Sequence, residues 1–591
     1  MSNYDQQSRL KVTTNTQDGY FDQVLAMSSH VINDGWTQLW NTYKDTDGKY
    51  ALKRIDIDED DFGSIHADIL PCKIQFIGDN TTGVGVYFYI NFTAGTLTND
   101  KKLTCDVAGW RLCVKVSVAE QKKADMTAEQ AQFIDDNYTG LGDYTVARLF
   151  ADLTKANFDQ LIPDKSTFGT DGTGKQITFD DWKKANPKLI GQFYGFMAEW
   201  TSDLGDKGLS TLGVKVTIPS MDDQDPLAPT YPPTLMLHQG FKYENPDTDK
   251  LVAEDYDCLL YCEQILNHPK PKQTFVRDAG NWCYPAYGNV PAVNGTFAIS
   301  GQVFFSGDNG ILQHMQPLAA LSQITLKDPT IDDTGDRYHY FDVGHNSQHE
   351  DPYDSYFLAK ADLDNHRYIW TTEDKRPAGR MNKWGSAYNY CEHQAVQTVT
   401  IGWEPGSNTI KVAGKTTYNY HDSDWDNASM TNRQARLEES YTSTWEVSIS
   451  VTTDDEGRLT LALGTEPQDA KVKVVQDYHH QDGYWINLQN TIEGYLSDFE
   501  KQLKQALVAV QTNLANIFKT TGQFVYPGNG VLQYKNPVFS NDGLVLAAAE
   551  YKALESKADV PPPYPGASLY KYPRTLPNMK ITTGSRQDSR Q

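Results

Sequence analysis

Cysteines are few in this sequence, and long apolar runs are missing. The 591 residues include 7 cysteines, none of them in a C-x-x-C pair. A small secreted domain held by disulfides would have more cysteines at closer spacing, so that class is excluded. No apolar run reaches the roughly 18 residues of a membrane-spanning helix. The opening residues, MSNYDQQSRLKV, lack the apolar core of a signal peptide. We therefore expect a cytoplasmic protein, or one released without a signal peptide.

Positive charge is also scarce. Lys and Arg number 53 against 77 Asp and Glu, which gives a formal net charge of −24. Phosphate backbones repel such a surface, so nucleic acid is not an expected partner. The same charge disfavours direct adhesion to anionic membranes.

Familiar catalytic motifs are missing too. The sequence has no G-x-S-x-G elbow, no H-E-x-x-H and no dinucleotide-binding glycine pattern in a strand–turn–helix context. GTDGTGK at 169–175 is close to a phosphate-binding loop, but Gln176 stands where Ser or Thr is required. A glycine-rich turn is expected there. No catalytic residue and no cofactor is predicted, and the balance favours a protein without enzymatic activity.

Two histidines form an H-x-x-x-H pair. His345 and His349 are followed directly by Glu350. On a helix, the two imidazoles would share one face and could bind zinc. The surrounding GHNSQHEDPYD is typical of a loop, so no metal site is predicted. These three residues are the candidates if one exists.

Aromatic residues are abundant, with 34 Tyr, 23 Phe and 12 Trp. A disordered chain would be poor in them, so most of this chain should fold around large cores. Cys258 and Cys262 alternate with apolar residues in DCLLYCEQIL, and we expect both thiols to be buried as small hydrophobic groups.

Helix patterns occur near both ends and in one internal stretch. Steps of three and four residues place side chains on one helix face. The stretch 125–205 is mostly of this kind and includes a stripe of Val146, Leu149, Phe150 and Leu153. The first pattern comprises Phe21, Val24, Leu25, Val31, Ile32, Trp36, Leu39, Trp40 and Tyr43. The last comprises Ile492, Leu496, Phe499, Leu503, Leu507, Val510, Leu514 and Phe518.

Strand patterns fill most of the remaining sequence, at 52–120 and 235–475. Apolar residues alternate with polar ones from Trp110 to Val118, which buries one strand face. DDEG at 454–457 predicts a hairpin between strands at 445–451 and 459–463. Antiparallel sheets are therefore expected.

Proline and polar residues suggest the domain limits. DDQDPLAPTYPPT contains too many prolines for a helix or a central strand. We predict a disordered N-terminus at 1–18, a first unit at 19–221, a Pro-rich linker at 222–234, a second unit at 235–555 and a flexible tail at 556–591.

Three segments together resemble one family. They are GYFDQVLAMSSHVIN at 19–33, NGTFAISGQVFFSGDNGILQHMQPL at 294–318, and the final helix with the sequence after it up to 552. They resemble the TULIP-fold (tubular lipid-binding) proteins, especially the companion proteins encoded beside clostridial neurotoxin genes and related uncharacterised fungal and bacterial proteins.

This resemblance implies an α+β fold. Long, strongly curved antiparallel β-sheets would wrap around long amphipathic helices, with 125–205 as a helical insertion. A sheet curled around a helix can leave an elongated apolar groove. The residues expected to line it are Phe21, Val24, Leu25, Trp36, Leu39, Leu496, Phe499, Leu503, Leu507, Val510 and Leu514.

Three function classes follow from these patterns. The first is non-catalytic binding of a lipid or other hydrophobic ligand in the groove. The second is a structural or interaction protein that partners a toxin or a biosynthetic enzyme. The third is an enzyme that acts on a hydrophobic substrate within the apolar cavity.

Overall fold

A computed structural model describes most of the chain between residues 21 and 551. The described ranges are 21–43, 51–77, 85–137, 145–153, 156–217, 233–244, 250–265, 267–271, 281–286, 291–306, 310–312, 315, 319, 324–326, 330–331, 339–340, 343–345, 359–381, 387–426, 433–454, 457, 459–464, 471–481, 501, 504–505, 508 and 532–551.

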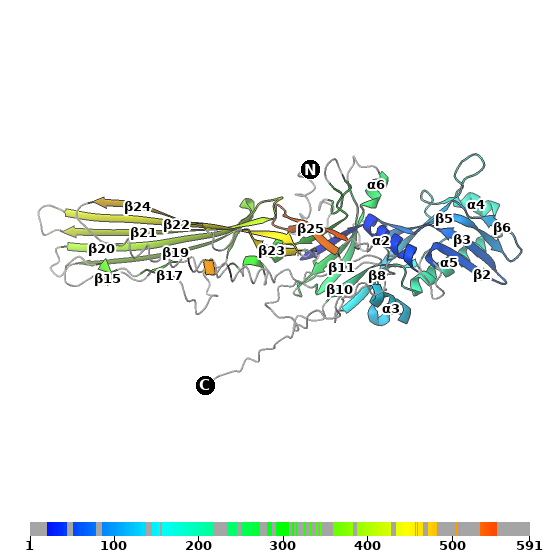
Figure 1. Cartoon of the computed structure of the whole chain (residues 1–591), viewed down its shortest axis with the longest axis horizontal. Helices are drawn as coiled ribbons and strands as arrows, with labels where there is room; N and C mark the ends of the chain where they lie inside the picture. The colour runs from blue at the N-terminus through cyan, green and yellow to red at the C-terminus, as the bar shows by residue number, and fades with distance from the viewer. Residues whose placement is uncertain are drawn as a thin grey trace, which may run out of the picture.

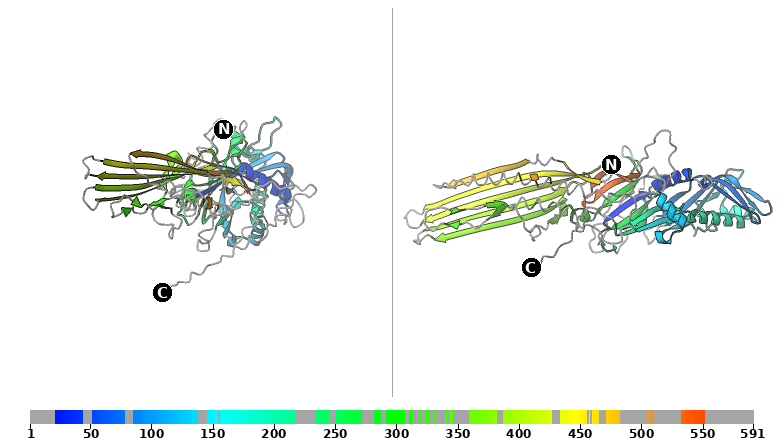
Figure 2. Two further views of the ribbon diagram at one scale, coloured as in Figure 1. Left: turned by 60° about the vertical axis from the view of Figure 1, so that its left-hand side comes forward. Right: turned by 60° about the horizontal axis from the view of Figure 1, so that its bottom comes forward.

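Three large antiparallel sheets follow one another along an elongated molecule (Figures 1 and 2). A nine-stranded sheet lies at one end, a six-stranded sheet in the middle and a seven-stranded sheet at the other end. We call them the N-terminal, central and long sheets. Every pairing between the described strands is antiparallel. The predicted α+β class with antiparallel sheets is confirmed.

The N-terminal sheet curls over a helix. Its main path runs β10-β8-β7-β5-β3-β2, with β4, β6 and β9 at the side. The predicted alternation from Trp110 to Val118 is confirmed, because each apolar residue of that series is buried. The strands are β2 (Arg54–Glu59), β3 (Gly63–Ile69), β4 (Lys73–Ile77), β5 (Gly85–Asn99), β6 (Thr104–Asp106), β7 (Trp110–Lys122), β8 (Thr145–Ala151), β9 (Thr167–Phe168) and β10 (Thr211–Thr217).

Helix α5 (Ile190–Asp206) packs against β3 and β5 of this sheet (Figure 2). Its buried stripe of Phe193, Phe196, Met197 and Trp200 meets aromatic rings of the sheet. Trp110 lies at the centre of this aromatic core, with ring centroids 4.5 Å from Phe168. The smaller helices nearby are α3 (Ala128–Asn137) and α4 (Phe179–Ala185).

The central sheet joins the two ends of the described chain. Its strand order is β11-β12-β1-β13-β26-β25, so β1 pairs with β12 and β13, and β26 pairs with β13. The last two strands, β25 and β26, pair with each other and complete the sheet at this edge. The strands are β1 (Gln23–Ser28), β11 (Leu235–Phe241), β12 (Cys258–Gln264), β13 (Gly295–Ile299), β25 (Leu532–Phe539) and β26 (Val545–Tyr551).

The long sheet contains the longest strands. The predicted hairpin at DDEG is confirmed, since Thr453 pairs with Leu459 across the turn. Gly457 adopts φ +78° there, a conformation that glycine tolerates best. The strands are β18 (Lys360–Asp362), β19 (Arg367–Met381), β20 (Ala387–Trp403), β21 (Thr409–Asp426), β22 (Arg433–Thr453), β23 (Leu459–Leu463) and β24 (Lys471–Gln481).

Short elements complete the described structure. Helix α6 (Lys250–Asp255) precedes β12, and a π-helical turn (Gln302–Ser306) follows β13. The short strands are β14 (Ile324–Leu326), β15 (Thr330–Ile331), β16 (His339–Tyr340) and β17 (Val343–His345). Strand β14 lies against β19 and β20 of the long sheet.

The predicted N-terminal helix is wrong over its first part. Residues 23–28 form strand β1, and helix α2 (Ser29–Thr42) begins only after it. Strand β1 lies between two neighbours and is buried at every position. A strand covered on both faces has no polar face, so its apolar residues also fit helical spacing.

The predicted helical insertion is also wrong in part. Helices α3, α4 and α5 do lie within 125–205, but Thr145–Ala151 forms strand β8. Its backbone pairs with β7 on one side and β10 on the other. Long-range pairing outweighs the local spacing of Val146, Leu149 and Phe150.

The long helices at both ends are not supported. Among the described residues the longest helix is α5, with 17 residues. The predicted C-terminal stripe at 492–518 lies outside the described residues, except for helical positions at 501, 504, 505 and 508. The linker at 222–234 likewise lies outside them, except for 233 and 234. The domain limits therefore stay a prediction.

Candidate functional site

The central sheet has two apolar faces. Along β1, Leu25 and Met27 belong to one buried cluster, whereas Val24 and Ala26 belong to another. Directly opposite residues of antiparallel strands share a face, so the register extends this division across the sheet. We call the first surface the interior face. It comprises Leu25, Met27, Met236, Leu259, Tyr261, Phe297, Ile299, Tyr534, Phe539, Val545, Ala547 and Ala549.

The interior face is continuous with the cores of both neighbouring sheets. One buried cluster contains residues of the interior face, Phe88 of the N-terminal sheet and Ile401 of the long sheet. On the long-sheet side, the Trp403 ring lies 4.8 Å from Phe305, and its Nε1 donates to the Ser540 carbonyl at 3.0 Å. An uninterrupted apolar interior therefore runs through all three sheets.

The N-terminal side of this interior is closed by helix α2. Trp36 and Trp40 are each 1% exposed, and their rings stack with centroids 6.4 Å apart. Trp36 Nε1 donates to the Thr211 carbonyl of β10 at 2.8 Å. Trp40 meets Trp200 of α5 edge to face. Helices α2 and α5 thus join in one aromatic core.

The predicted groove residues do not all come together. Leu25 and Trp36 belong to the interior cluster. Phe21 and Val24 belong to the cluster on the opposite face of the central sheet. Leu39 lies in α2, but its side chain is outside the described residues. The remaining six, Leu496, Phe499, Leu503, Leu507, Val510 and Leu514, also lie outside them.

Two fully buried polar side chains lie on the interior face, and the partly buried His238 of β11 lies there too, opposite Tyr261. Gln23 of β1 and Glu263 of β12 are directly opposite each other, and they are 3% and 1% exposed. On its other side, Glu263 is opposite Met236 of β11. Among the described residues, Glu263 Oε1 has no hydrogen-bond partner. Burial raises the pKa of Glu263 to about 8, so its carboxyl group is mostly protonated at neutral pH.

The charge of Glu263 affects the pKa of Tyr534, a tyrosine at the far edge of the same sheet. Burial, and then the charge of Glu263, raise the pKa of Tyr534 on β25. Three strands separate β12 from β25 in the sheet order. The Tyr534 ring also stacks on Phe297 of β13, with centroids 4.8 Å apart. Glu263 and Tyr534 therefore face the same interior.

Glu263 is not among the residues predicted from the sequence. It lies in DCLLYCEQIL, next to Cys262, and both cysteines of this segment are buried as expected. The available signal was a single acidic residue inside an otherwise apolar strand. Such a residue must be paired, neutralised or functional when its strand is buried.

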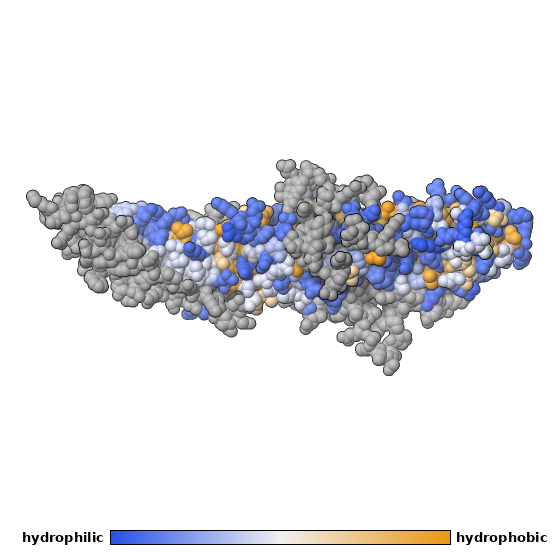
Figure 3. Space-filling model, turned by 90° about the horizontal axis from the view of Figure 1, so that it is seen from above, coloured by the Kyte–Doolittle hydropathy of each residue, from blue (hydrophilic) through white to orange (hydrophobic). Residues whose placement is uncertain are grey.

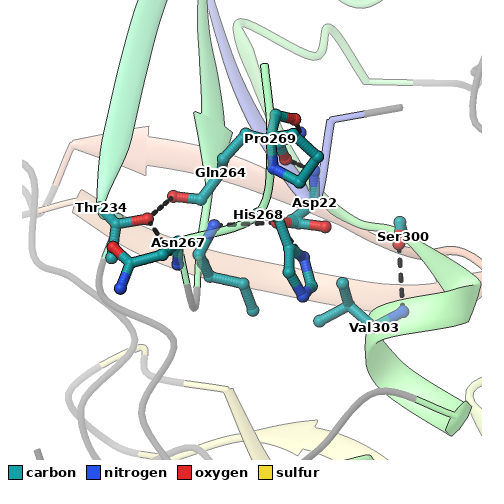
Figure 4. A network of polar contacts seen from close by, with 9 residues as sticks. Asp22, Thr234, Gln264, Asn267, His268, Pro269, Ser300 and Val303 are labelled. Atoms are coloured by element: carbon teal, nitrogen blue, oxygen red, sulfur yellow. Dashed lines mark hydrogen bonds and ion pairs between the residues drawn. The ribbon is translucent and has the colours of Figure 1, made fainter. Parts of the chain in front are cut away.

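A polar network closes one end of the central sheet (Figure 4). Asp22 precedes β1 and is 1% exposed. Its Oδ2 accepts from the Ile265 amide at 2.8 Å and lies 2.9 Å from His268 Nδ1. The Asp22 amide donates to Gln264 Oε1 at 3.0 Å, and the Asp22 carbonyl accepts from the Ser300 amide at 2.8 Å.

This network ties three strands together. Asp22 joins the start of β1 to the ends of β12 and β13, which lie on its two sides. The Ser300 hydroxyl accepts from the Val303 amide at 3.1 Å and so begins the following helical turn. A carboxylate that accepts a hydrogen bond from a buried amide and contacts a histidine can hold these strand ends in place. We interpret it as a structural clasp.

The inner face of the long sheet changes from apolar to polar along its length. Val399 and Ile401 near the central sheet belong to the apolar interior. Farther out, Gln397, Thr416 and Ser443 are directly opposite one another on β20, β21 and β22. All three are at most 5% exposed. Gln397 Nε2 donates to the Ala319 carbonyl at 2.9 Å.

Polar groups continue beyond that row. His393 is completely buried, and its Nδ1 lies 3.5 Å from the Tyr418 hydroxyl. Arg376 is directly opposite His393, and its guanidinium pairs with Asp374 on the same strand at 2.8 Å. The apolar cluster of the interior therefore ends at the row of Gln397, and buried Ala395, Tyr418 and Tyr420 lie beyond it among these polar groups.

The histidine pair and the glycine-rich segment, which were candidate binding motifs in the sequence, do not form binding sites among the described residues. His345 ends strand β17 but its side chain is outside the described residues, as are His349 and Glu350. No cluster of potential metal ligands occurs in the part of the chain that the structure describes. The segment 169–175 is a turn, as expected: Asp171 Oδ1 accepts from the Thr173 and Lys175 amides at 2.8 and 3.0 Å. These two amides are therefore already hydrogen-bonded to a carboxylate of the same turn.

Within the described residues, no helix has the length and apolar character needed to cross a membrane.

Comparisons with known proteins do not assign a family. No family model matches the chain, and no curated protein matches it. Among solved structures, a crystal structure of lipopolysaccharide binding protein is similar over 90% of this chain and 99% of that chain. The two are 11% identical, with a TM-score of 0.29. That TM-score is too low to support an argument, so the resemblance to TULIP-fold proteins stays a prediction.

Proposed function

We propose that this protein binds a lipid or another apolar molecule in its interior, without catalysing a reaction. The supporting observation is the uninterrupted apolar cluster that joins all three sheets. An apolar interior favours a molecule with long hydrocarbon chains, because such a molecule loses apolar contact with water along its whole length when it enters.

The outer surface contrasts with this interior. Figure 3 shows hydrophilic residues over most of the coloured face, with hydrophobic residues only in small spots. The exposed large hydrophobic residues of the described chain are Phe62, Leu70, Leu103, Val252, Leu363 and Val508. Scattered single residues of this kind are normal on a soluble surface. The proposed binding region is therefore inside the molecule.

The apolar interior has a definite limit on the long-sheet side. Beyond Ile401, the long sheet presents the buried polar row of Gln397, Thr416 and Ser443. Among the described residues, the Ser443 hydroxyl has no hydrogen-bond partner. Hydrocarbon chains would lie on the apolar side of this row.

Extraction of lipid from the purified protein tests the proposal. The protein is purified without detergent, extracted with organic solvent and examined by mass spectrometry. We expect a lipid or other apolar compound in near-stoichiometric amount. A folded protein that is empty after purification, and that takes up no lipid from mixed vesicles, would contradict the proposal.

A matched pair of variants locates the ligand. Ala547 on β26 belongs to the interior face, whereas its neighbour Ala548 is half-buried and points away from it. Ala547→Leu adds side-chain volume to the interior and is expected to lower the amount of bound lipid several-fold. Ala548→Leu adds the same volume outside and should leave the amount unchanged. Equal lipid content in the two variants would place the ligand elsewhere.

A further inference from the structure

Glu263 is an unusual group for an apolar interior. It is 1% exposed, and its strand neighbours on the same face are Tyr261 and Ile265 of the apolar cluster. Its Oε1 has no hydrogen-bond partner among the described residues. Buried polar atoms are nearly always paired, and an unpaired one costs free energy that a bound molecule can recover.

The chemistry around Glu263 restricts that molecule. The side chains directly opposite Glu263 are Gln23 and Met236, and neither is a cation. His238 lies on the same face one step along β11, opposite Tyr261. An anion brought to this position would be buried with no Lys or Arg of the described residues directly opposite it, which is strongly unfavourable. A neutral carboxyl group both donates and accepts a hydrogen bond, and so does a hydroxyl group.

We infer that the polar end of the bound lipid lies against Glu263, and that this lipid is a neutral molecule with a hydroxyl or similar hydrogen-bonding head rather than an anion. The inference rests on the proposed function and adds the class of ligand. It also gives the buried acid a role that no contact within the described chain supplies.

Two lipids with identical acyl chains test the inference. Diacylglycerol ends in a neutral hydroxyl, whereas phosphatidic acid has an anionic phosphate at the same position. The full chain is stripped of lipid, and the affinity for each is measured by transfer from labelled vesicles. We expect diacylglycerol to bind at least about tenfold more tightly, as one hydrogen bond to a buried group can provide.

Two variants of Glu263 show whether this side chain sets the preference. Glu263→Gln keeps a neutral group that donates and accepts hydrogen bonds, so it should keep the preference. Glu263→Leu removes the hydrogen bond and should weaken diacylglycerol binding about tenfold relative to the native protein, whereas phosphatidic acid, which makes no such bond, should bind no better than before. A melting curve of each variant confirms that it is folded.

Each result supports or overturns the inference. Equal affinity of the native protein for both lipids, or tighter binding of phosphatidic acid, overturns it but leaves the proposed function standing. Diacylglycerol binding to Glu263→Leu that is as tight as binding to the native protein also overturns it. Failure of the native protein to bind any lipid overturns the proposed function as well. The native comparison decides even if a variant does not fold.

Discussion

Single buried residues account for the clearest polar features of this protein. Asp22 and Glu263 are each 1% exposed, yet their surroundings differ. Asp22 accepts from the Ile265 amide and contacts His268. Glu263 Oε1 has no such partner among the described residues. The first residue therefore stabilises the fold, whereas the second decreases stability when it ionises.

The stability of the fold should fall with rising pH because of Glu263. Burial raises the pKa of this group from 4.5 to about 8. Between these values the folded protein holds a proton that the unfolded chain has released. The free energy of unfolding then decreases as pH rises, by roughly 1.4 kcal/mol per pH unit at most. Below pH 4.5 both states are protonated, and above 8 both are ionised, so this dependence levels off.

Glu263→Gln should remove that dependence. The amide does not titrate, so the variant should match the native protein near pH 5 and exceed its stability by pH 8. Urea unfolding at a series of pH values measures the difference. A constant difference between the two proteins at every pH would contradict the assigned role of Glu263.

Asp22→Ala should destabilise the protein by about 2 to 3 kcal/mol. The substitution leaves the buried Ile265 amide without its acceptor at the end of β12. His268→Ala is the matched control, because the His268 side chain is 33% exposed and its loss should cost at most about 1 kcal/mol. Urea unfolding compares the two variants. Equal losses would show that the amide contact is not what makes Asp22 important.

At the scale of elements, strand length and close packing shape the long sheet. Strands β20, β21 and β22 have 17, 18 and 21 residues, and they pair along nearly their full lengths. The Trp445 ring of β22 lies over Gly414 of β21, directly opposite in the register. A glycine at this position lets a large ring lie flat against the neighbouring strand.

Gly414→Ala should therefore disturb the long sheet. A Cβ added at Gly414 would lie 2.1 Å from the Trp445 ring, so the ring must move. We expect a loss of about 1 to 3 kcal/mol and a changed near-ultraviolet circular dichroism signal. Gly191→Ala in α5 is the control, since a Cβ there meets nothing within 4 Å. A silent Gly414→Ala variant would contradict the packing of Trp445.

At the scale of the whole molecule, the surface repels anionic partners, whereas the interior favours apolar molecules. The net charge of −24 keeps the surface away from anionic partners. The interior, by contrast, presents one apolar cluster through three sheets. Lipid uptake should consequently depend on transfer into the interior rather than on adhesion to a charged membrane.

Vesicle flotation measures this consequence. At low salt, the protein should float no better with vesicles rich in anionic lipid than with neutral phosphatidylcholine vesicles, because like charges repel. The expected recovery in the floating fraction is low for both. Strong flotation with anionic vesicles that is lost in high salt would reveal a basic surface that the net charge conceals.

Sequence patterns predicted the strands better than the helices. The alternation from Trp110 to Val118 and the turn at 454–457 specify half-buried strands and a hairpin, because both signals are local. The β1 segment was mistaken for helix, because a strand covered on both faces loses its alternation. The burial of Glu263 is likewise not predictable from local spacing, because it depends on strands far away in the sequence.

The acidic charge, the aromatic content and the antiparallel strands are predictable from the amino-acid sequence alone, because they follow from composition and short-range spacing. The position of β1 between β12 and β13, more than two hundred residues away, emerges only in the folded chain. The apolar interior that Glu263 faces emerges there as well. Both outcomes depend on long-range register, which no local pattern contains.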